Sequence, residues 1–184
     1  MAKEIIIPAV NRFEWAAALI APAADDNILE IGCGAGLLAE LITASLVRGK
    51  LTAIDSSASM TRKAEKRNQA SIGSGKLSLL TKSFAEAGLR QSFNKIVAFN
   101  VNFFWKNTED ELALIRKLLT TDGKLFVFYQ TPSGIDLQLM KKIEDMLSRN
   151  GFRIYRTLVE DKEPVRSFAL IATVHQQPWH PLLV

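Results

Sequence analysis

The stretch "NILEIGCGAG", residues 27–36, constrains the fold more than any other part of this sequence. A short apolar run carries one acid, Glu30, and is followed by glycines at positions 32, 34 and 36. Glycine loses more backbone entropy on folding than any other residue, so three glycines at alternate positions need a structural reason. A sharp turn from a buried strand into a helix provides one reason, and a ligand lying close to the main chain provides another.

Strand-like and helix-like segments alternate along the rest of the chain. Periodicity predicts strands at 27–31, 50–55, 76–83, 93–101, 124–131, 152–160 and 167–174, and helices at 14–21, 36–47, 57–71, 108–120 and 136–151. This alternation is typical of an α/β fold with a mostly parallel sheet and helices on both faces. Only "DKEPVR" joins the last two strands, which is too short for a helical crossover, so they should pair antiparallel.

The length of 184 residues suits a single domain. We expect an N-terminal helical lead-in at 1–26, a cofactor-binding half at 27–131, a closing helix and hairpin at 132–175, and a tail at 176–184. No apolar run reaches the roughly 18 residues that span a bilayer, and the N-terminus does not have the pattern of a signal peptide, which predicts a cytoplasmic protein. One cysteine and two histidines are too few for an internal disulfide or a metal site built from these residues.

The net charge of +4 raises the question of a nucleic-acid partner. The basic residues are scattered, and Glu65 interrupts the densest cluster, at 61–68, in the manner of a solvated helix face. A stripe of cations with interleaved aromatic residues, which a nucleic-acid surface needs, is absent from the sequence. We therefore expect no nucleic-acid site. A small-molecule substrate is the default expectation, with no membrane contact and a monomer or weak homodimer.

The glycine stretch and a second acid together predict a nucleoside cofactor. Open α/β sheets bind ligands beyond the carboxyl ends of their strands, and Asp55 ends the second strand, where an acid accepts hydrogen bonds from ribose hydroxyls. Three features disfavour a dinucleotide. The first glycine, Gly32, comes directly after the strand, so the tight turn begins there. Leu37 stands where the third glycine of that motif should be, and Glu30 would repel a pyrophosphate but suits a positively charged cofactor.

These motifs resemble those of the class I S-adenosylmethionine-dependent methyltransferases, in which E-x-G-x-G-x-G ends the first strand and an acid ends the second. The resemblance extends over nearly the whole chain through "TAIDSSASMTRKAEKRN", "LLTTDGKLFVF" and the closing hairpin, while "NRFEWAAALI" and "FNVNFFW" are similar to small single-domain bacterial enzymes. It implies a Rossmann-like, doubly wound, seven-stranded sheet in the order 3-2-1-4-5-7-6 with an antiparallel last strand. It also implies S-adenosylmethionine as cofactor and S-adenosylhomocysteine as product.

The resemblance assigns a role to each matched position. Glu30 would face the methionine amine, and Asp55 would take the ribose hydroxyls. The other implied positions are the backbone of Gly32, Cys33, Gly34 and Gly36 against the methionine and ribose, Ser56 and Met60 beside the adenine, Ser83 and Phe84 next to the adenine amine, and Asn100 at the methionine end. Ser83 departs from the family, which usually has an acid there, and a serine would bind the amine more weakly.

Methyl transfer from a sulfonium needs mainly positioning, and a general base only where the acceptor must lose a proton. The sequence shows no obvious base, so the catalytic residues stay unknown. Candidates for positioning the acceptor are Tyr129, Asn102 and Trp105, with Phe103 and Phe104 as possible pocket walls; candidates for a cap over the site are Asn11, Arg12 and Trp15.

Three functions stay open at this point. The first is methyl transfer to a small molecule. The second is a non-catalytic, methyltransferase-like binding module, which Ser83 and the missing base keep open. The third is a nicotinamide-dependent oxidoreductase on the related fold.

Overall fold

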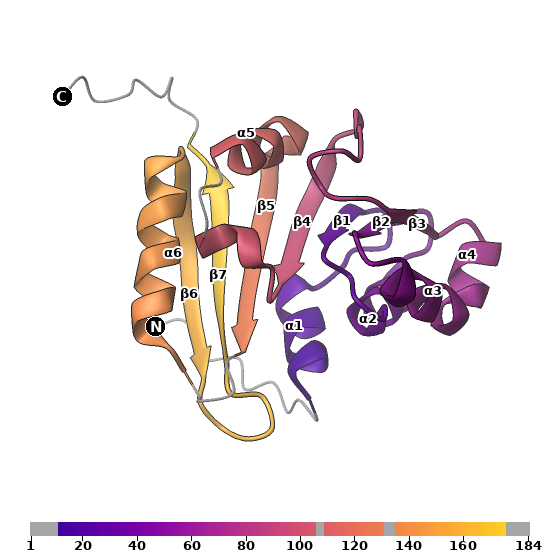
Figure 1. Cartoon of the computed structure of the whole chain (residues 1–184), viewed down its shortest axis with the longest axis horizontal. Coiled ribbons are helices and arrows are strands. Elements are labelled where there is room, and N and C mark those ends of the chain that lie inside the picture. The colour runs from indigo at the N-terminus through magenta and orange to yellow at the C-terminus, as the bar shows by residue number, and fades with distance from the viewer. Residues whose placement is uncertain (1–10, 106–108, 131–134, 176–184) are drawn as a thin grey trace.

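A seven-stranded sheet forms the centre of the computed structural model, which describes residues 11–105, 109–130 and 135–175 (Figure 1). The strands follow the order β3-β2-β1-β4-β5-β7-β6. All neighbours among the first five are parallel, and β7 is antiparallel to both β5 and β6. The predicted order and the antiparallel closing hairpin are therefore confirmed. The strands are β1 (Asn27–Ile31), β2 (Lys50–Asp55), β3 (Leu77–Thr81), β4 (Phe93–Phe99), β5 (Leu119–Gln130), β6 (Phe152–Glu160) and β7 (Ser167–Val174).

Helices cover both faces of the sheet, as a doubly wound fold requires. On one face, α1 (Arg12–Ile20) and α2 (Leu37–Ser45) share one core cluster with the strands. On the other face, α5 (Glu109–Leu118), α6 (Leu137–Arg149) and the short 3-10 helix η1 (Asn102–Trp105) share a second cluster. The remaining helices, α3 (Ala58–Arg67) and α4 (Gln69–Gly73), lie beside β2 and β3 (Figure 1).

The alternation of side chains along β1 explains where Glu30 lies. Leu29 and Ile31 belong to the cluster under α5 and α6, whereas Ile28 belongs to the cluster under α1 and α2. Successive side chains of a strand point to opposite faces, so Glu30 shares the face of Ile28. That face is covered, and the carboxyl group is consequently buried.

Most predicted boundaries lie within two residues of those in the structure, and two segments differ more. The helix expected at 57–71 is divided at Asn68, whose side-chain amide donates to the carbonyls of Gly36 and Ala64. The segment between the predicted helix at 108–120 and the predicted strand at 124–131 lies within β5 as a bulge. Phe93 pairs with Leu119 and Lys95 with Lys124, so β5 advances five residues while β4 advances two.

Within the described ranges, none of the helices combines the length and the apolar character needed to cross a membrane. The same ranges contain no group of three or more His, Cys, Asp or Glu side chains that could hold a metal ion.

Candidate functional site

The carboxyl ends of β1, β2, β4 and β5 meet at one edge of the sheet. From β1 the chain proceeds outward to β2 and β3, whereas β4 lies on the other side of β1 and leads to β5. This change of direction is a topological switch point, where open α/β sheets bind ligands. The glycine loop, residues 32–36, leaves β1 at this point and enters α2.

All three glycines of this loop have positive φ angles, of 74°, 53° and 73° at Gly32, Gly34 and Gly36. A Cβ on Gly32 would lie 2.8 Å from Val101 Cγ2, and one on Gly36 would lie 2.9 Å from Ala64 Cβ. A Cβ on Gly34 would meet nothing within 4 Å. Packing within the protein therefore explains the outer two glycines, while Gly34 faces open space in which a ligand could approach the backbone.

Asp55 ties the glycine loop to the end of β2. Its Oδ2 accepts a hydrogen bond of 2.8 Å from the Gly34 amide, and its Oδ1 accepts one of 2.9 Å from the Ser57 amide. The carbonyl of Ile54 accepts from the amides of Gly32 and Cys33. Each carboxylate oxygen has a second lone pair, so Asp55 can hold the loop and still accept a hydrogen bond from a ligand.

Glu30 carries the strongest electrostatic signal of the site. The residue is 2% exposed, and its Oε2 has no hydrogen-bond partner among the described residues. Burial, and to a lesser extent the charge of Asp55, raises the pKa of this carboxyl to about 8. A buried acid with a shifted pKa and an unsatisfied oxygen is typical of a functional site, and it would accept a cationic donor.

Cys33 lies in the same loop and is buried. Burial, together with the negative charges of Glu30 and Asp55, raises the pKa of its thiol. A thiol held in its protonated form is a poor nucleophile, so Cys33 contributes a small apolar side chain to this part of the core.

The residues expected around an adenine differ in accessibility. Ser56 is exposed and Met60 is 36% exposed, so both can reach a ligand. Phe84 is 6% exposed and its side chain packs in the core cluster, and its place beside an adenine amine stays a prediction. Ser83 donates a hydrogen bond of 2.5 Å to Glu86 Oε2. Ser83 therefore lies beside an acid, Glu86, which is three positions further along the chain and was not predicted as a site residue.

On the β4–β5 side, Asn100 organises the strand ends. Its φ of 54° places it in the left-handed region, and its Oδ1 accepts a hydrogen bond of 2.8 Å from the Gln130 amide. Its side chain therefore joins the ends of β4 and β5.

Gln130 connects this pair to α1. Its side-chain oxygen accepts from Arg12, and its side-chain amide donates to the carbonyl of Val165 at 2.8 Å. The Arg12 guanidinium lies 4.8 Å from the ring centroid of Phe13 and 5.7 Å from that of Phe99. Hydrogen bonding and cation–π contact thus hold a cation at the carboxyl ends of β4 and β5. Gln130 was not predicted, since nothing in its local sequence marks it.

Tyr129 does not lie on the rim where an acceptor was expected. Its side chain is 1% exposed, packs against Phe168 with ring centroids 5.6 Å apart, and donates its hydroxyl to the Val101 carbonyl. Burial raises its pKa. Strand alternation explains the correction, because Tyr129 belongs to the core cluster under α5 and α6. It anchors the segment after β4 from within the core.

The other acceptor and cap candidates take varied positions. Asn102 is exposed at the start of η1, and Phe104 is buried in the core. The side chains of Phe103 and Trp105 lie outside the described part of the chain.

Two of the three expected cap residues have structural roles. Asn11 caps α1 by accepting from the amides of Phe13 and Glu14. Trp15 is 5% exposed and packs edge-on against Phe128, with ring centroids 5.8 Å apart. Of the three, only Arg12 presents a charged group at the strand ends.

Comparison with known proteins agrees with this geometry. A family model described as a methyltransferase domain matches residues 28–123. The chain is 35% identical over 100 residues to the malonyl-[acyl-carrier protein] O-methyltransferase of Anoxybacillus flavithermus, an alignment that covers 54% of this chain and 37% of that protein. The curated relatives that it matches are covered over only 28% to 61% of their length.

Solved structures of methyltransferases share the fold at low sequence identity. An S-adenosylmethionine-dependent methyltransferase from Aquifex aeolicus has a TM-score of 0.73 and 16% identity, covering 88% of this chain and 89% of that one. Another is the magnesium protoporphyrin IX methyltransferase of Synechocystis PCC 6803, solved with bound S-adenosylmethionine. It has a TM-score of 0.64 and 21% identity, covering 88% of this chain and 77% of that one.

The glycine loop allows a matched stability test. We expect Gly36→Ala to lower the free energy of unfolding by about 2–4 kcal/mol, because positive φ and overpacking against Ala64 both oppose the methyl group. Gly34→Ala should lower the free energy of unfolding by only about 1 kcal/mol, because the positive φ of Gly34 opposes the methyl group but no neighbouring atom does. Urea unfolding of the two variants measures the difference, and equal losses would contradict the packing described for Gly36.

The raised pKa of Glu30 predicts a pH dependence. Between pH 4.5 and about 8, the unfolded chain loses this proton while the folded protein keeps it, so Glu30 lowers stability as pH rises. Glu30→Gln should therefore be more stable than the natural protein at pH 8, by about 2–4 kcal/mol, with a difference that shrinks toward pH 4.5.

Thermal unfolding at a series of pH values measures this effect, with the exposed Glu65→Gln as control. A constant difference between Glu30→Gln and the natural protein over this range would show that the carboxyl titrates normally.

Proposed function

The chain belongs to the methyltransferase-domain family, and from this we propose that it transfers a methyl group from S-adenosylmethionine to a small-molecule acceptor. The observation that carries the proposal is Glu30, a buried carboxyl with an unsatisfied oxygen behind a glycine loop that leaves open space at Gly34. These features suit a ligand that presents a cation and approaches the main chain. When bound, this cofactor would supply a methyl group on a sulfonium that carries its own leaving group.

Different residues of the chain would bind different parts of this cofactor. Glu30 would accept from the ammonium of the methionine portion, and Asp55 would use its remaining lone pairs for the ribose hydroxyls. Ser83 and Glu86 would offer acceptors to the adenine amine, so that Glu86 takes the place of the acid missing at Ser83.

We further propose that the acceptor carries an anionic oxygen, such as a carboxylate. A carboxylate is already deprotonated at neutral pH and needs no general base, which agrees with a site where the sequence shows no obvious base. Arg12 would orient it, since a guanidinium has five N–H donors and the bond to Gln130 uses one of them. The Anoxybacillus relative is named as an O-methyltransferase, which supports oxygen as the acceptor atom.

Two alternatives remain as outcomes of experiment. A non-catalytic module would bind the cofactor and transfer no methyl group. A nicotinamide-dependent enzyme is disfavoured by Leu37, which stands where the third glycine of the dinucleotide motif should be. The cytoplasmic location stays a prediction from the sequence.

Calorimetric titration with S-adenosylhomocysteine tests the cofactor. We expect binding that Asp55→Asn weakens by about 1.5–3 kcal/mol, because hydrogen bonds to a charged acceptor are lost. Asp145→Asn, on the exposed part of α6, should bind as the natural protein does. Binding of NADH with none of S-adenosylhomocysteine would contradict the proposal, and unchanged affinity in Asp55→Asn would show that the ribose lies elsewhere.

A screen of pooled small carboxylic acids for cofactor-dependent gain of one methyl group tests the acceptor. We expect methyl esters, recognised by the methanol they release in dilute alkali. Arg12→Gln should raise the KM for the acceptor about tenfold or more, as loss of a charge-assisted pair predicts, while the affinity for S-adenosylhomocysteine stays unchanged. Products methylated on nitrogen or carbon would contradict a carboxylate acceptor.

A further inference from the structure

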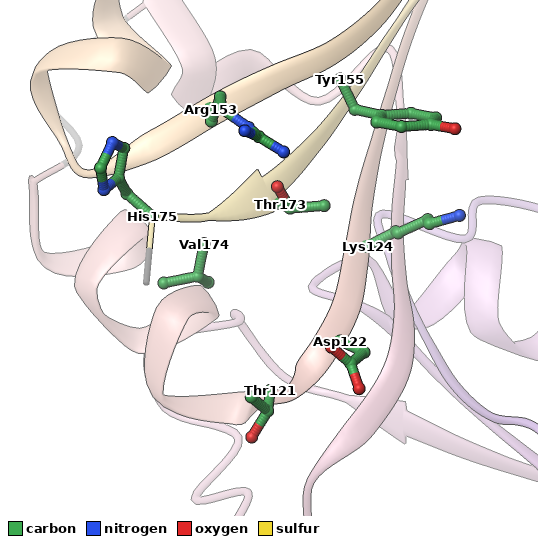
Figure 2. A pocket seen from close by; sticks show the side chains of 8 residues that line it. All are labelled: Thr121, Asp122, Lys124, Arg153, Tyr155, Thr173, Val174 and His175. Carbon is green, nitrogen blue, oxygen red and sulfur yellow. The ribbon is translucent and has the colours of Figure 1, made fainter. Parts of the chain in front are cut away.

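A hollow of about 660 Å³ lies on the sheet away from the glycine loop. It opens over the beginning of β5 and β6 and the end of β7, and its walls include Asp122, Lys124, Arg153, Tyr155, Thr173 and His175 (Figure 2). Along β5, Lys124 is about 20 Å from Gln130, at a rise of about 3.3 Å per residue. The hollow is therefore separate from the proposed methyl-transfer site.

The strand register places two cations on either side of one hydroxyl. Thr173 of β7 pairs with Lys124 of β5 on one side and with Arg153 of β6 on the other. Residues directly opposite one another on neighbouring strands point to the same face, with Cβ atoms about 5 Å apart. In Figure 2 the Arg153 guanidinium points toward Thr173. The Lys124 side chain points away from Thr173 in this view, and its flexible stem would have to rotate to bring the ammonium to a group bound above the threonine.

These cations lack the carboxylate partners that usually neutralise neighbouring charges. In the described ranges, neither Lys124 nor Arg153 forms an ion pair, and the Lys124 ammonium lies 5.1 Å from the ring centroid of Tyr155. Among the residues that line the hollow, Asp122 carries a negative charge, while Lys124 and Arg153 carry permanent positive charges. Such an arrangement leaves a local excess of positive charge that an anion would neutralise.

We propose that this hollow binds the phosphate group of a small phosphate monoester. Arg153 would hold two phosphate oxygens through its planar fork, Lys124 would contribute a point charge, and the Thr173 hydroxyl would donate to a third oxygen. Tyr155, which is 60% exposed, would pack against the organic part, and Asp122 would accept from its hydroxyl or amine groups.

The hollow is better suited to a small monoester than to a nucleic-acid strand. A nucleic-acid strand needs a longer row of cations with several aromatic side chains on which bases stack. The hollow offers two cations, Lys124 and Arg153, and one exposed ring, Tyr155. The Asp122 carboxylate on the wall would also repel a continuing phosphodiester backbone.

Calorimetric titration with inorganic phosphate and with glycerol 3-phosphate, at constant ionic strength against chloride, tests this site. We expect both to bind the natural protein, glycerol 3-phosphate more tightly. Arg153→Gln and Lys124→Gln should each weaken phosphate binding about tenfold, as loss of a charge-assisted bond predicts. Lys142→Gln, which removes the same charge from the exposed surface of α6, should change nothing.

Circular dichroism and thermal unfolding of each variant show that it folds, and Arg153→Lys should retain part of the affinity. Equal phosphate binding in Arg153→Gln and Lys142→Gln would overturn the proposal, as would no binding by the natural protein. An oligonucleotide without terminal phosphates that binds as tightly as glycerol 3-phosphate would also overturn it. Asp55→Asn, which is directed at the other site, should leave phosphate binding unchanged.

Discussion

The carboxylate of Asp55 is the group on which the candidate site depends most. Its two oxygens accept from the amides of Gly34 and Ser57, so one side chain holds the glycine loop after β1 and the start of α3 after β2. Hydrogen bonds to a charged acceptor are among the stronger ones in proteins. The loop can then keep its three left-handed glycines in a single arrangement before any ligand arrives.

The same charge acts on the second acid of the site. Glu30 is buried with an unsatisfied oxygen, and Asp55 adds to the effect of burial in raising its pKa. A buried polar group without a partner destabilises a protein, so its presence at the switch point of the sheet agrees with a binding role. On the other side of the switch point, Asn100 and Gln130 join the ends of β4 and β5. Arg12, which bonds to Gln130, is the charged group at these strand ends.

Much of the fold could be predicted because apolar periodicity and turn residues report on local structure. The strand order, the antiparallel hairpin and the glycine loop all follow from such patterns or from the family resemblance they support. The boundary between α5 and β5 could not be predicted, since pairing with β4 draws residues 120–123 into a bulge where local preference indicates a turn. Tyr129 was misplaced because a residue near a strand end can face either the core or the rim of the sheet, and Tyr129 faces the core.

The sequence by itself determined the class of fold and the character of the cofactor loop, through glycines at 32, 34 and 36 and acids at 30 and 55. These are constraints on backbone conformation and charge, and they act over a few neighbouring residues. Only the tertiary structure decided which glycine faces open space, where Arg12 lies relative to Gln130, and that Lys124 and Arg153 flank Thr173. Those relations join residues far apart in the chain, and sheet pairing and core packing bring them together.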